Sequence, residues 1–240
     1  MKRLAGKVAI ITGGGSGIGR GLSVALTQEG AQVVICGRRQ EKLDETLRIV
    51  RTSGGDAQAV QADIAQEADV QRLVQATLTD YGRIDILINN AGTYSSSELH
   101  TVDPHSWDSV MSVNLRGPYL AMRAVLPLMR TQRSGHIINI SSESGLNYYK
   151  GDSAYGTSKH ALNDLGEYVQ SENQEHNIKV NTICPGMVVS EMSENEPDLN
   201  LEKCLYPEDI AELAIWLLTR RQNIKIGTPI LIQTMLNPWE

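Results

Sequence analysis

The chain has no surplus of positive charge. Its 240 residues include 22 lysines and arginines against 28 aspartates and glutamates, a formal net charge of −6. A nucleic-acid-binding domain would carry a basic face, so this balance argues against that function class. The sequence also lacks any apolar run of the roughly 18 residues that a transmembrane helix needs. No apolar stretch follows Lys2 and Arg3, so we see no secretory signal peptide and expect a cytoplasmic protein.

Cysteine and histidine are too few and too scattered to suggest a metal site. The three cysteines, Cys36, Cys184 and Cys204, are an odd number without the spacing of metal ligands. Cys36 and Cys184 lie in apolar runs, where a buried free thiol is the ordinary state. Free thiols fit a reducing compartment. The five histidines show no ligand pattern, and we expect no bound metal.

Short apolar runs alternate along the chain with segments of helical periodicity. The runs are continuous, which is typical of strands buried on both faces of a sheet. Between them, apolar residues recur at helical spacing, as at Leu22 and Leu26. This repetition predicts one α/β domain over residues 1–240: a doubly wound, Rossmann-like parallel sheet of seven strands with helices on both faces. We expect strands at 8–11, 33–36, 86–88, 137–140, 180–184 and 230–232, with 57–61 as a weaker seventh.

A glycine-rich segment follows the first predicted strand and opens the first predicted helix. Its glycines Gly13, Gly17 and Gly19 would permit a tight turn, a close approach of the backbone to a pyrophosphate, and close packing of helix on strand. The free N–H groups and positive dipole end of a helix favour an anion there. A glycine-rich turn that binds nothing is the competing interpretation, and the strand–loop–helix context weighs against it.

The end of the second predicted strand bears on the choice between NAD(H) and NADP(H). An acidic residue there would accept hydrogen bonds from the adenosine 2′-hydroxyl and repel a 2′-phosphate, but the sequence reads Gly37, Arg38, Arg39. Either arginine would instead pair with the phosphate, which favours NADP(H). A pair of solvated arginines at the start of a helix is the alternative interpretation.

Tyr155 and Lys159 are the residues whose types and spacing point most directly to a catalytic role. They lie four positions apart and therefore share one face of a helix. A free phenol has a pKa of about 10, and a nearby ammonium would lower it and help the phenol exchange a proton with a carbonyl oxygen. Ser141 and Ser142 follow the predicted strand at 137–140, at the sheet edge where a site is expected. A tyrosine at this spacing from a lysine is common by chance, so the pair gains its meaning from the other motifs.

These motifs together resemble the short-chain dehydrogenase/reductase family, in its single-domain branch, and the similarity spans nearly the whole chain. The segment from Thr12 to Gly19 is similar to the family's cofactor loop, and Ser142, Tyr155 and Lys159 follow in the family's order and spacing. The resemblance implies that Tyr155 is the general acid/base and that Lys159 lowers its pKa and binds the nicotinamide ribose. It also implies that Ser142 orients the substrate oxygen.

The resemblance extends to the cofactor-binding residues and to the proton relay. Asn114 matches the asparagine that holds a water in the relay, and Asp63 matches the acid that contacts adenine. Val188 stands where the family's backbone binds the carboxamide. The cofactor-binding residues expected on this basis are Gly13, Ser16, Gly17, Ile18, Gly19, Arg38, Asp63, Ile64, Asn90, Ala91, Gly92, Tyr155, Lys159, Pro185, Gly186, Val188 and Ser190.

Some positions depart from the family pattern. Ser190 stands where a threonine is usual and still offers a hydroxyl. Ser16 replaces a basic residue that many NADP(H) members carry, so NAD(H) stays an alternative cofactor. The segment at 227–240 lacks the usual Asp-Gly-Gly and is more similar to the branch acting on small hydroxy acids and hydroxyamino acids than to fatty-acid ketoreductases. The acid-rich stretch 190–203 is either a mobile substrate lid or a solvated loop.

The sequence therefore predicts an NADP(H)-dependent oxidoreductase that interconverts a carbonyl and a primary or secondary alcohol on a small hydroxy or oxo compound. A 3-oxoacyl-[acyl-carrier-protein] reductase is the alternative, but only Lys150 and Lys203 are in place to receive an acidic carrier. A dinucleotide-sensing protein without catalysis is more remote, because all three catalytic residues are present. The resemblance implies a homo-oligomer, a tetramer or a dimer. The expected substrate-lining residues are Tyr94, Ser96, Ser142, Asn147, Tyr148, Tyr149, Tyr155, Met187 and Met192.

Overall fold

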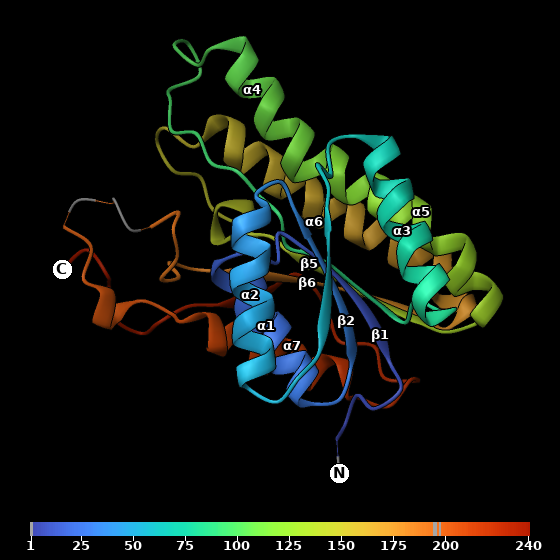
Figure 1. Cartoon of the computed structure of the whole chain (residues 1–240). Helices are drawn as coiled ribbons and strands as arrows, with labels where there is room; N and C mark the ends of the chain where they lie inside the picture. The colour runs from blue at the N-terminus through green and yellow to red at the C-terminus, as the bar shows by residue number, and fades with distance from the viewer. Residues whose placement is uncertain (1, 194–195, 197) are drawn as a thin grey trace.

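A single seven-stranded parallel sheet forms the centre of the molecule (Figure 1). The computed structural model describes residues 2–193, 196 and 198–240. The strand order is β3-β2-β1-β4-β5-β6-β7, and every neighbouring pair runs parallel. The predicted fold class is therefore confirmed, the weaker seventh strand included. The strands are β1 (Val8–Thr12), β2 (Gln32–Gly37), β3 (Ala57–Gln61), β4 (Ile86–Asn89), β5 (Gly135–Ile140), β6 (Ile178–Pro185) and β7 (Ile230–Ile232).

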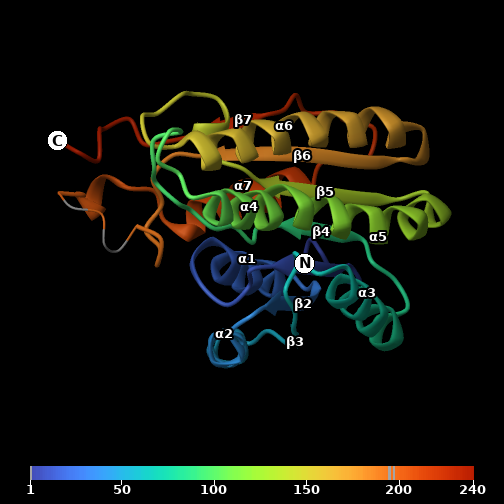
Figure 2. The same ribbon diagram turned by 90° about the horizontal axis from the view of Figure 1, so that it is seen from above.

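Helices cover both faces of this sheet (Figure 2). The hydrophobic residues of α1, α2 and α7 pack on one face, and those of α3, α5 and α6 pack on the other. The helical segments are α1 (Gly17–Gln28), α2 (Gln40–Thr52), α3 (Glu67–Tyr81), α4 (Pro104–Met111), a π-helical turn (Ser112–Arg116), α5 (Gly117–Gln132), α6 (Ser153–Asn173), α7 (Pro207–Leu218) and short 3₁₀ turns at Glu143–Gly145, Gln174–His176 and Leu201–Lys203.

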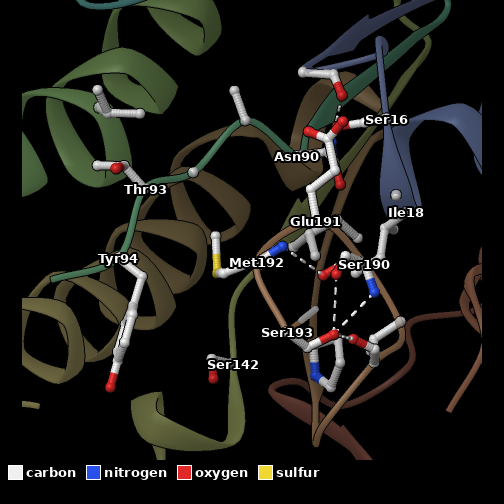
Figure 3. Close-up of a pocket in the computed structure, with 18 of the residues that line it drawn as sticks. Ser16, Ile18, Asn90, Thr93, Tyr94, Ser142, Ser190, Glu191, Met192 and Ser193 are labelled. Carbon is white, nitrogen blue, oxygen red and sulfur yellow. Dashed lines mark hydrogen bonds between the residues drawn. The ribbon is translucent and has the colours of Figure 1, made fainter. Parts of the chain in front are cut away.

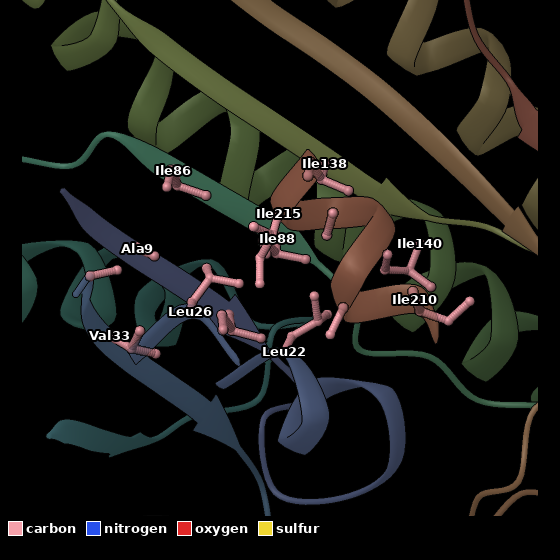
Figure 4. Packing of buried hydrophobic residues seen from close by; sticks show 14 of the residues in the cluster. Ala9, Leu22, Leu26, Val33, Ile86, Ile88, Ile138, Ile140, Ile210 and Ile215 are labelled. Carbon is pink, nitrogen blue, oxygen red and sulfur yellow. The ribbon is translucent and has the colours of Figure 1, made fainter. Parts of the chain in front are cut away.

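The continuous apolar character of the strands follows from this double cover. Along β2, Val33 and Ile35 face the α1–α7 layer, while Val34 and Cys36 face the opposite layer. Because side chains alternate along a strand, a strand that is covered on both faces is apolar at most of its positions. Figure 4 shows the first of these layers, in which Leu22 and other aliphatic residues of α1 and α7 pack against the central strands.

The sheet order places a crevice at the carboxyl ends of β1 and β4. From β1 the chain winds outward to β2 and β3, then returns to β4 on the other side of β1. A reversal of this kind leaves a gap between the loops that follow the two strands, and ligands of open α/β sheets bind there. No helix among the described residues has the length and apolarity required to cross a membrane. The three cysteines are buried and free.

Candidate active site

One large cavity runs along the carboxyl edge of the sheet and has a volume of about 850 Å³. The loops after β1, β2, β3 and β4 line the part that we call the coenzyme half. The loop after β5, together with Tyr94, Met187 and Met192, lines the part that we call the substrate half, and the rest of the segment after β6 borders the coenzyme half. Figure 3 shows Ser16 on one side of the cavity, Tyr94 and Ser142 on another, and Met192 between them.

The glycine loop has the geometry that its sequence predicts. Gly13 and Gly17 adopt φ angles of +67° and +50°, which L side chains rarely tolerate. A Cβ atom on Gly19 would lie 2.2 Å from the carbonyl oxygen of Gly13, so only glycine lets α1 start this close to the loop. The backbone conformation therefore requires glycine at positions 13, 17 and 19.

The N-terminus of α1 opens into the coenzyme half without a side-chain cap. Ser16 is the N-cap residue, and its hydroxyl makes no capping hydrogen bond. The first N–H groups of a helix have no partner within the helix, and together with the helix dipole they attract an anion. Arg20 Nη2 and Thr46 Oγ1 donate hydrogen bonds of 2.7 and 3.1 Å to the Gly15 carbonyl, which fixes the loop. This uncapped, rigid cradle fits a pyrophosphate.

Asn90 joins the glycine loop to β4. Its side-chain nitrogen donates hydrogen bonds to the carbonyls of Thr12 (2.9 Å) and Gly13 (3.2 Å). The Thr12 hydroxyl accepts hydrogen bonds in return from the backbone N–H groups of Asn90 and Ala91. Asn90 thus holds the two strand ends at the crevice in a fixed relation, and Gly92 continues the cavity wall beyond them.

Four charged residues meet where the adenosine end of a dinucleotide would lie. Arg38, Arg39 and Lys42 all line the cavity, and Glu191 approaches them from the segment after β6. Glu191 Oε2 lies 2.5 Å from Arg39 Nη2, and Oε1 lies 2.7 Å from Lys42 Nζ. Arg38 is exposed and takes part in none of the ion pairs found among the described residues. Lys42, in α2, thus places a positive charge here, whereas Ser16 of the glycine loop provides none.

The remaining predicted cofactor residues lie around the same half. Asp63 and Ile64, after β3, line the cavity; the Asp63 Oδ1 atom accepts a hydrogen bond from the Ala65 N–H. Pro185, Gly186, Val188 and Ser190 line it from the segment that follows β6. Ser193 Oγ donates to the Val188 carbonyl (2.9 Å) and accepts from the Ser190 N–H (2.9 Å), which forms a closed turn here. Glu194, Asn195 and Pro197, also in the stretch 190–203, lie outside the described residues.

Tyr155, Ser142 and Lys159 converge at the inner end of the cavity. Tyr155 and Lys159 come from the first turns of α6, and Ser142 follows β5 directly. The Ser142 hydroxyl hydrogen-bonds Tyr155 and so opposes the rise of its phenol pKa. Lys159 Nζ lies 5.5 Å from the centre of the Tyr155 ring and donates a 3.0 Å hydrogen bond to the Ile140 carbonyl. The three residues expected from the sequence are brought together.

Burial dominates the protonation of these groups. Desolvation raises the pKa of Tyr155 to about 12 and lowers the pKa of Lys159 to about 8. Both shifts favour the neutral form of a buried group. At neutral pH Tyr155 is therefore a phenol, which can donate a proton.

Asn114 lies beneath this cluster in the π-helical turn between α4 and α5. Its Oδ1 atom accepts a 2.8 Å hydrogen bond from the Thr93 N–H, and its Nδ2 atom donates to the Thr93 carbonyl and to Ser158 Oγ. Gly92 lies so close that a Cβ there would be 3.5 Å from Asn114 Oδ1 and 3.7 Å from Lys159 Nζ. The side chain of Asn114 thus anchors the loop after β4 against α6.

The substrate half contains most of the residues expected there. Tyr94 packs edge-on against the Tyr155 ring at 5.1 Å, and its hydroxyl donates a 2.9 Å hydrogen bond to Asp152. Tyr149, Met187 and Met192 also line this half.

Three expected lining residues lie elsewhere. The Asn147 side chain bends back to the Glu143 carbonyl (3.3 Å) and is not part of the cavity wall. Tyr148 is stacked on the His160 ring, with the ring centres 5.0 Å apart. Ser96 is likewise outside the lining. The tip of the loop 146–151 points away from the cavity. The order of residues in the sequence does not predict this direction.

Comparison with known proteins identifies the family. The family model described as short chain dehydrogenase matches residues 7–200. The chain belongs to the short-chain dehydrogenase/reductase family. An uncharacterized oxidoreductase of Staphylococcus saprophyticus is 36% identical over 228 residues, which cover 95% of this chain and 97% of that protein. The chain is thus an NAD(P)-dependent oxidoreductase of this family.

Solved structures agree with this assignment. A metagenomic short-chain oxidoreductase in complex with NADP superposes with a TM-score of 0.86 at 34% identity, covering 98% of this chain and 100% of the other. Levodione reductase gives a TM-score of 0.85 at 31% identity, covering 90% and 91%.

Several cavity residues of this dehydrogenase escaped the sequence reasoning. Lys42, Glu143, Glu191, Glu196 and Trp239 all line the cavity. Lys42 lies in the first turn of α2, three positions after the N-cap residue Arg39, so it could have been considered together with the two arginines. Trp239 carries no such signal. The tail reaches the cavity because the Asn200 N–H donates to the Pro238 carbonyl (2.9 Å), a contact between distant parts of the chain.

Proposed function

We propose that this protein is an NADP(H)-dependent oxidoreductase that interconverts a carbonyl group and a primary or secondary alcohol on a small hydroxy or oxo compound. The observation that carries the proposal is the meeting of the Ser142 and Tyr155 hydroxyls inside the cavity, next to Lys159. A substrate oxygen held by both hydroxyls would be positioned for proton transfer from the phenol.

Each catalytic residue has a distinct task in this proposal. Bound nicotinamide supplies or accepts the hydride. Tyr155, kept protonated by burial, donates its proton to the carbonyl oxygen during reduction. Ser142 hydrogen-bonds the same oxygen and fixes its direction. Lys159 points its ammonium at the space beside the tyrosine, where it binds ribose hydroxyls and stabilises the phenolate left behind.

The choice of NADP(H) over NAD(H) is supported by the positive charge at the adenosine end. Gly37 leaves no acid to repel a 2′-phosphate, and Arg38, Arg39 and Lys42 line the cavity beside it. An arginine pairs with a phosphate through parallel hydrogen bonds. The similar metagenomic oxidoreductase was crystallised with NADP. Asn114, Asp63 and the backbone at Val188 complete the proposed set, with the relay, adenine and carboxamide roles that the family resemblance implies.

The alternative substrate, an acyl chain on an acidic carrier protein, is not favoured by the charges at the mouth of the cavity. Lys150 is paired with Glu98 at 2.9 Å, and Lys203 donates to the backbone carbonyl of Glu240. Glu196 adds a negative charge to the cavity lining, whereas Glu191 is paired with Arg39 and Lys42. An acidic carrier would meet repulsion here. A binding protein without catalysis is disfavoured because Ser142, Tyr155 and Lys159 are all present and adjacent.

The proposal is tested by following the absorbance of NADPH with the purified protein and a panel of small aldehydes, ketones and alcohols. We expect turnover in both directions, and we expect Ser142→Ala to reduce it strongly while NADPH still binds. A protein that binds NADPH but turns over no carbonyl or alcohol in the panel would exclude the proposed function.

A further inference from the structure

A carboxylate without a cationic partner lies beside the reacting groups. Glu143 directly follows Ser142 and lines the substrate half of the cavity. It takes part in none of the ion pairs found among the described residues. Its side chain is half-buried, and burial raises its pKa, while a hydrogen bond with Tyr149 opposes the rise. A hydrogen bond from a further donor stabilises a half-buried carboxylate of this kind.

The position of Glu143 is set from two sides. Its backbone carbonyl accepts hydrogen bonds from the N–H groups of Leu146 and Asn147, both 2.9 Å, which hold the 3₁₀ turn after Ser142. A Cβ atom on Gly186 would lie 3.6 Å from Glu143 Oε2, so the carboxylate stands opposite the turn that follows β6. The carboxylate therefore lies between the segment that bears Ser142 and the turn proposed to flank the nicotinamide.

The other charged groups of the substrate half are already engaged. Asp152 accepts 2.9 Å hydrogen bonds from the hydroxyls of Tyr94 and Ser144, one on each oxygen. Lys150 is turned outward to Glu98. Lys159 donates to the Ile140 carbonyl and is buried beneath the tyrosine. Among the described residues of this half, no cation is thus directed at Glu143.

We propose that Glu143 recognises a hydrogen-bond donor, a hydroxyl or an ammonium group, that the substrate carries close to its reacting carbonyl. The substrate is then a neutral or cationic hydroxy- or aminocarbonyl compound. Oxo acids and hydroxy acids are excluded, because a second carboxylate beside Glu143 would be repelled. This inference rests on the proposed carbonyl–alcohol function and specifies its substrate class.

The test uses four ketones of similar size, of which three carry a hydroxyl, an amino or a carboxylate group next to the carbonyl and one carries no polar group there. They are 2-pentanone, 1-hydroxy-2-butanone, 1-amino-2-butanone and 2-oxobutanoate, each reduced with NADPH. We expect kcat/KM for the hydroxy or amino ketone to exceed the value for 2-pentanone by about tenfold or more, the range of a hydrogen bond to a charged group. We expect 2-oxobutanoate to be the poorest substrate. The better of the two favoured probes tells whether hydroxyl or ammonium is preferred.

The variant Glu143→Gln keeps the size of the side chain and removes its charge. It should lower the preference for the amino ketone over 2-pentanone by about tenfold and make 2-oxobutanoate a relatively better substrate, as judged by kcat/KM. Glu143→Asp keeps the charge on a shorter side chain and should retain part of the preference. Glu202→Gln removes an exposed acid outside the cavity lining and serves as the matched control, with ratios like those of the wild type.

The outcomes separate this inference from the proposed function. If 2-pentanone is reduced as well as the hydroxy and amino ketones, and Glu143→Gln leaves all ratios unchanged, the inference fails and the carbonyl reductase stands. Preferred reduction of 2-oxobutanoate by the wild type would also overturn it. If neither these probes nor any compound of a broader carbonyl panel is reduced, the proposed function fails. The inference about Glu143 then fails too, because it depends on that function.

Discussion

Glu191 forms an ion pair with Arg39 at 2.5 Å and thereby ties the segment after β6 to the start of α2. Lys42 binds the other carboxylate oxygen at 2.7 Å. The hydrogen bonds from Lys42 and Arg39 lower the pKa of Glu191 to about 2, so the group is ionised at neutral pH. Two of the three cations that face the adenosine end of the cavity, Arg39 and Lys42, are therefore engaged by a carboxylate of the protein itself.

We expect Glu191→Gln to tighten the binding of NADPH. A 2′-phosphate would compete with Glu191 for Arg39 and Lys42, and the variant removes the competitor. Exposed ion pairs contribute roughly 0.2–1 kcal/mol each, and the variant removes two of them, so the dissociation constant of NADPH should fall by about two- to thirtyfold. The measurement is a fluorescence titration with NADPH and NADH, repeated at higher salt.

NADH supplies the internal control for this variant, since it lacks the 2′-phosphate and its affinity should change little. Glu202→Gln should bind both cofactors as the wild type does. Weaker NADPH binding by Glu191→Gln would mean that Glu191 orients the two cations instead of competing for them.

The double variant Gly37→Asp with Arg38→Ile should shift cofactor preference toward NADH. Wild-type protein is expected to prefer NADPH by about tenfold or somewhat more, since a charge-assisted hydrogen bond contributes roughly 1.5–3 kcal/mol. An aspartate at the end of β2 would accept hydrogen bonds from the 2′-hydroxyl and repel the phosphate. The measurement is kcat/KM for both cofactors. Equal values in the wild type would show that Arg38 is a solvated surface charge.

The sequence predicted the strands and the catalytic residues because both depend on local patterns. Strands such as β5 are read from continuous apolar runs, and Tyr155 and Lys159 lie within one helical turn. For the strands and for this pair, spacing in the sequence translates directly into spacing in the fold. Ser142 was expected beside Tyr155 from the resemblance to the family, because no local periodicity links the two residues.

Contacts between distant segments could not be predicted in this way. Glu191 and Arg39 are 152 positions apart, and nothing in the periodicity of either segment points to the other. Asn147 was expected to line the cavity because it lies in the loop after the catalytic serine, yet a hydrogen bond to the Glu143 carbonyl draws it away. Loop direction is decided by such individual bonds, which hydrophobic patterns do not encode.

Tyr155→Phe should abolish most of the activity without affecting the fold. The variant keeps the buried ring and its edge-on contact with Tyr94 but removes the proton donor. General acid–base catalysis contributes about 10²–10⁴-fold, so kcat should fall by that factor while the dissociation constant of NADPH changes little. Turnover near that of the wild type would contradict the assignment of Tyr155 as the acid/base.

We expect the protein to form a homotetramer, because apolar residues are exposed on two separate faces. Tyr119 and Tyr168 are 45% and 69% exposed on α5 and α6, and Trp216 and Leu231 are each 45% exposed on α7 and β7. Closed symmetry with two kinds of interface gives a tetramer, and exposed apolar patches commonly mark such interfaces.

Light scattering at micromolar concentration tests this assembly against the chain mass of 26.3 kDa. Trp216→Glu places a charge on one face only and should leave a dimer held by the α5–α6 face. A monomeric wild type would exclude the tetramer, and a variant that stays tetrameric would exclude the α7–β7 face as an interface.

The free energy of unfolding should decrease as the pH is lowered below about 6.5, because one buried histidine, His136, lies on β5. His136 Nε2 lies 2.9 Å from Asn181 Oδ1, and burial, assisted by the charge of Lys179, lowers the His136 pKa from 6.5 to about 4. Between these values the unfolded chain binds a proton that the folded protein does not. The free energy of unfolding is therefore highest above pH 6.5 and decreases as the pH falls toward 4.

The decrease should be at most about 1.4 kcal/mol per pH unit and about 3 kcal/mol in total from this group. Urea unfolding of the wild type and of His136→Gln at several pH values between 7 and 5 measures it. Glutamine retains a donor for Asn181 but does not titrate, so the variant should show a shallower slope even if it is less stable at every pH. Parallel slopes would mean that the pKa of His136 is the same in the folded and unfolded protein, and the decrease in the free energy of unfolding would then come from other titratable groups.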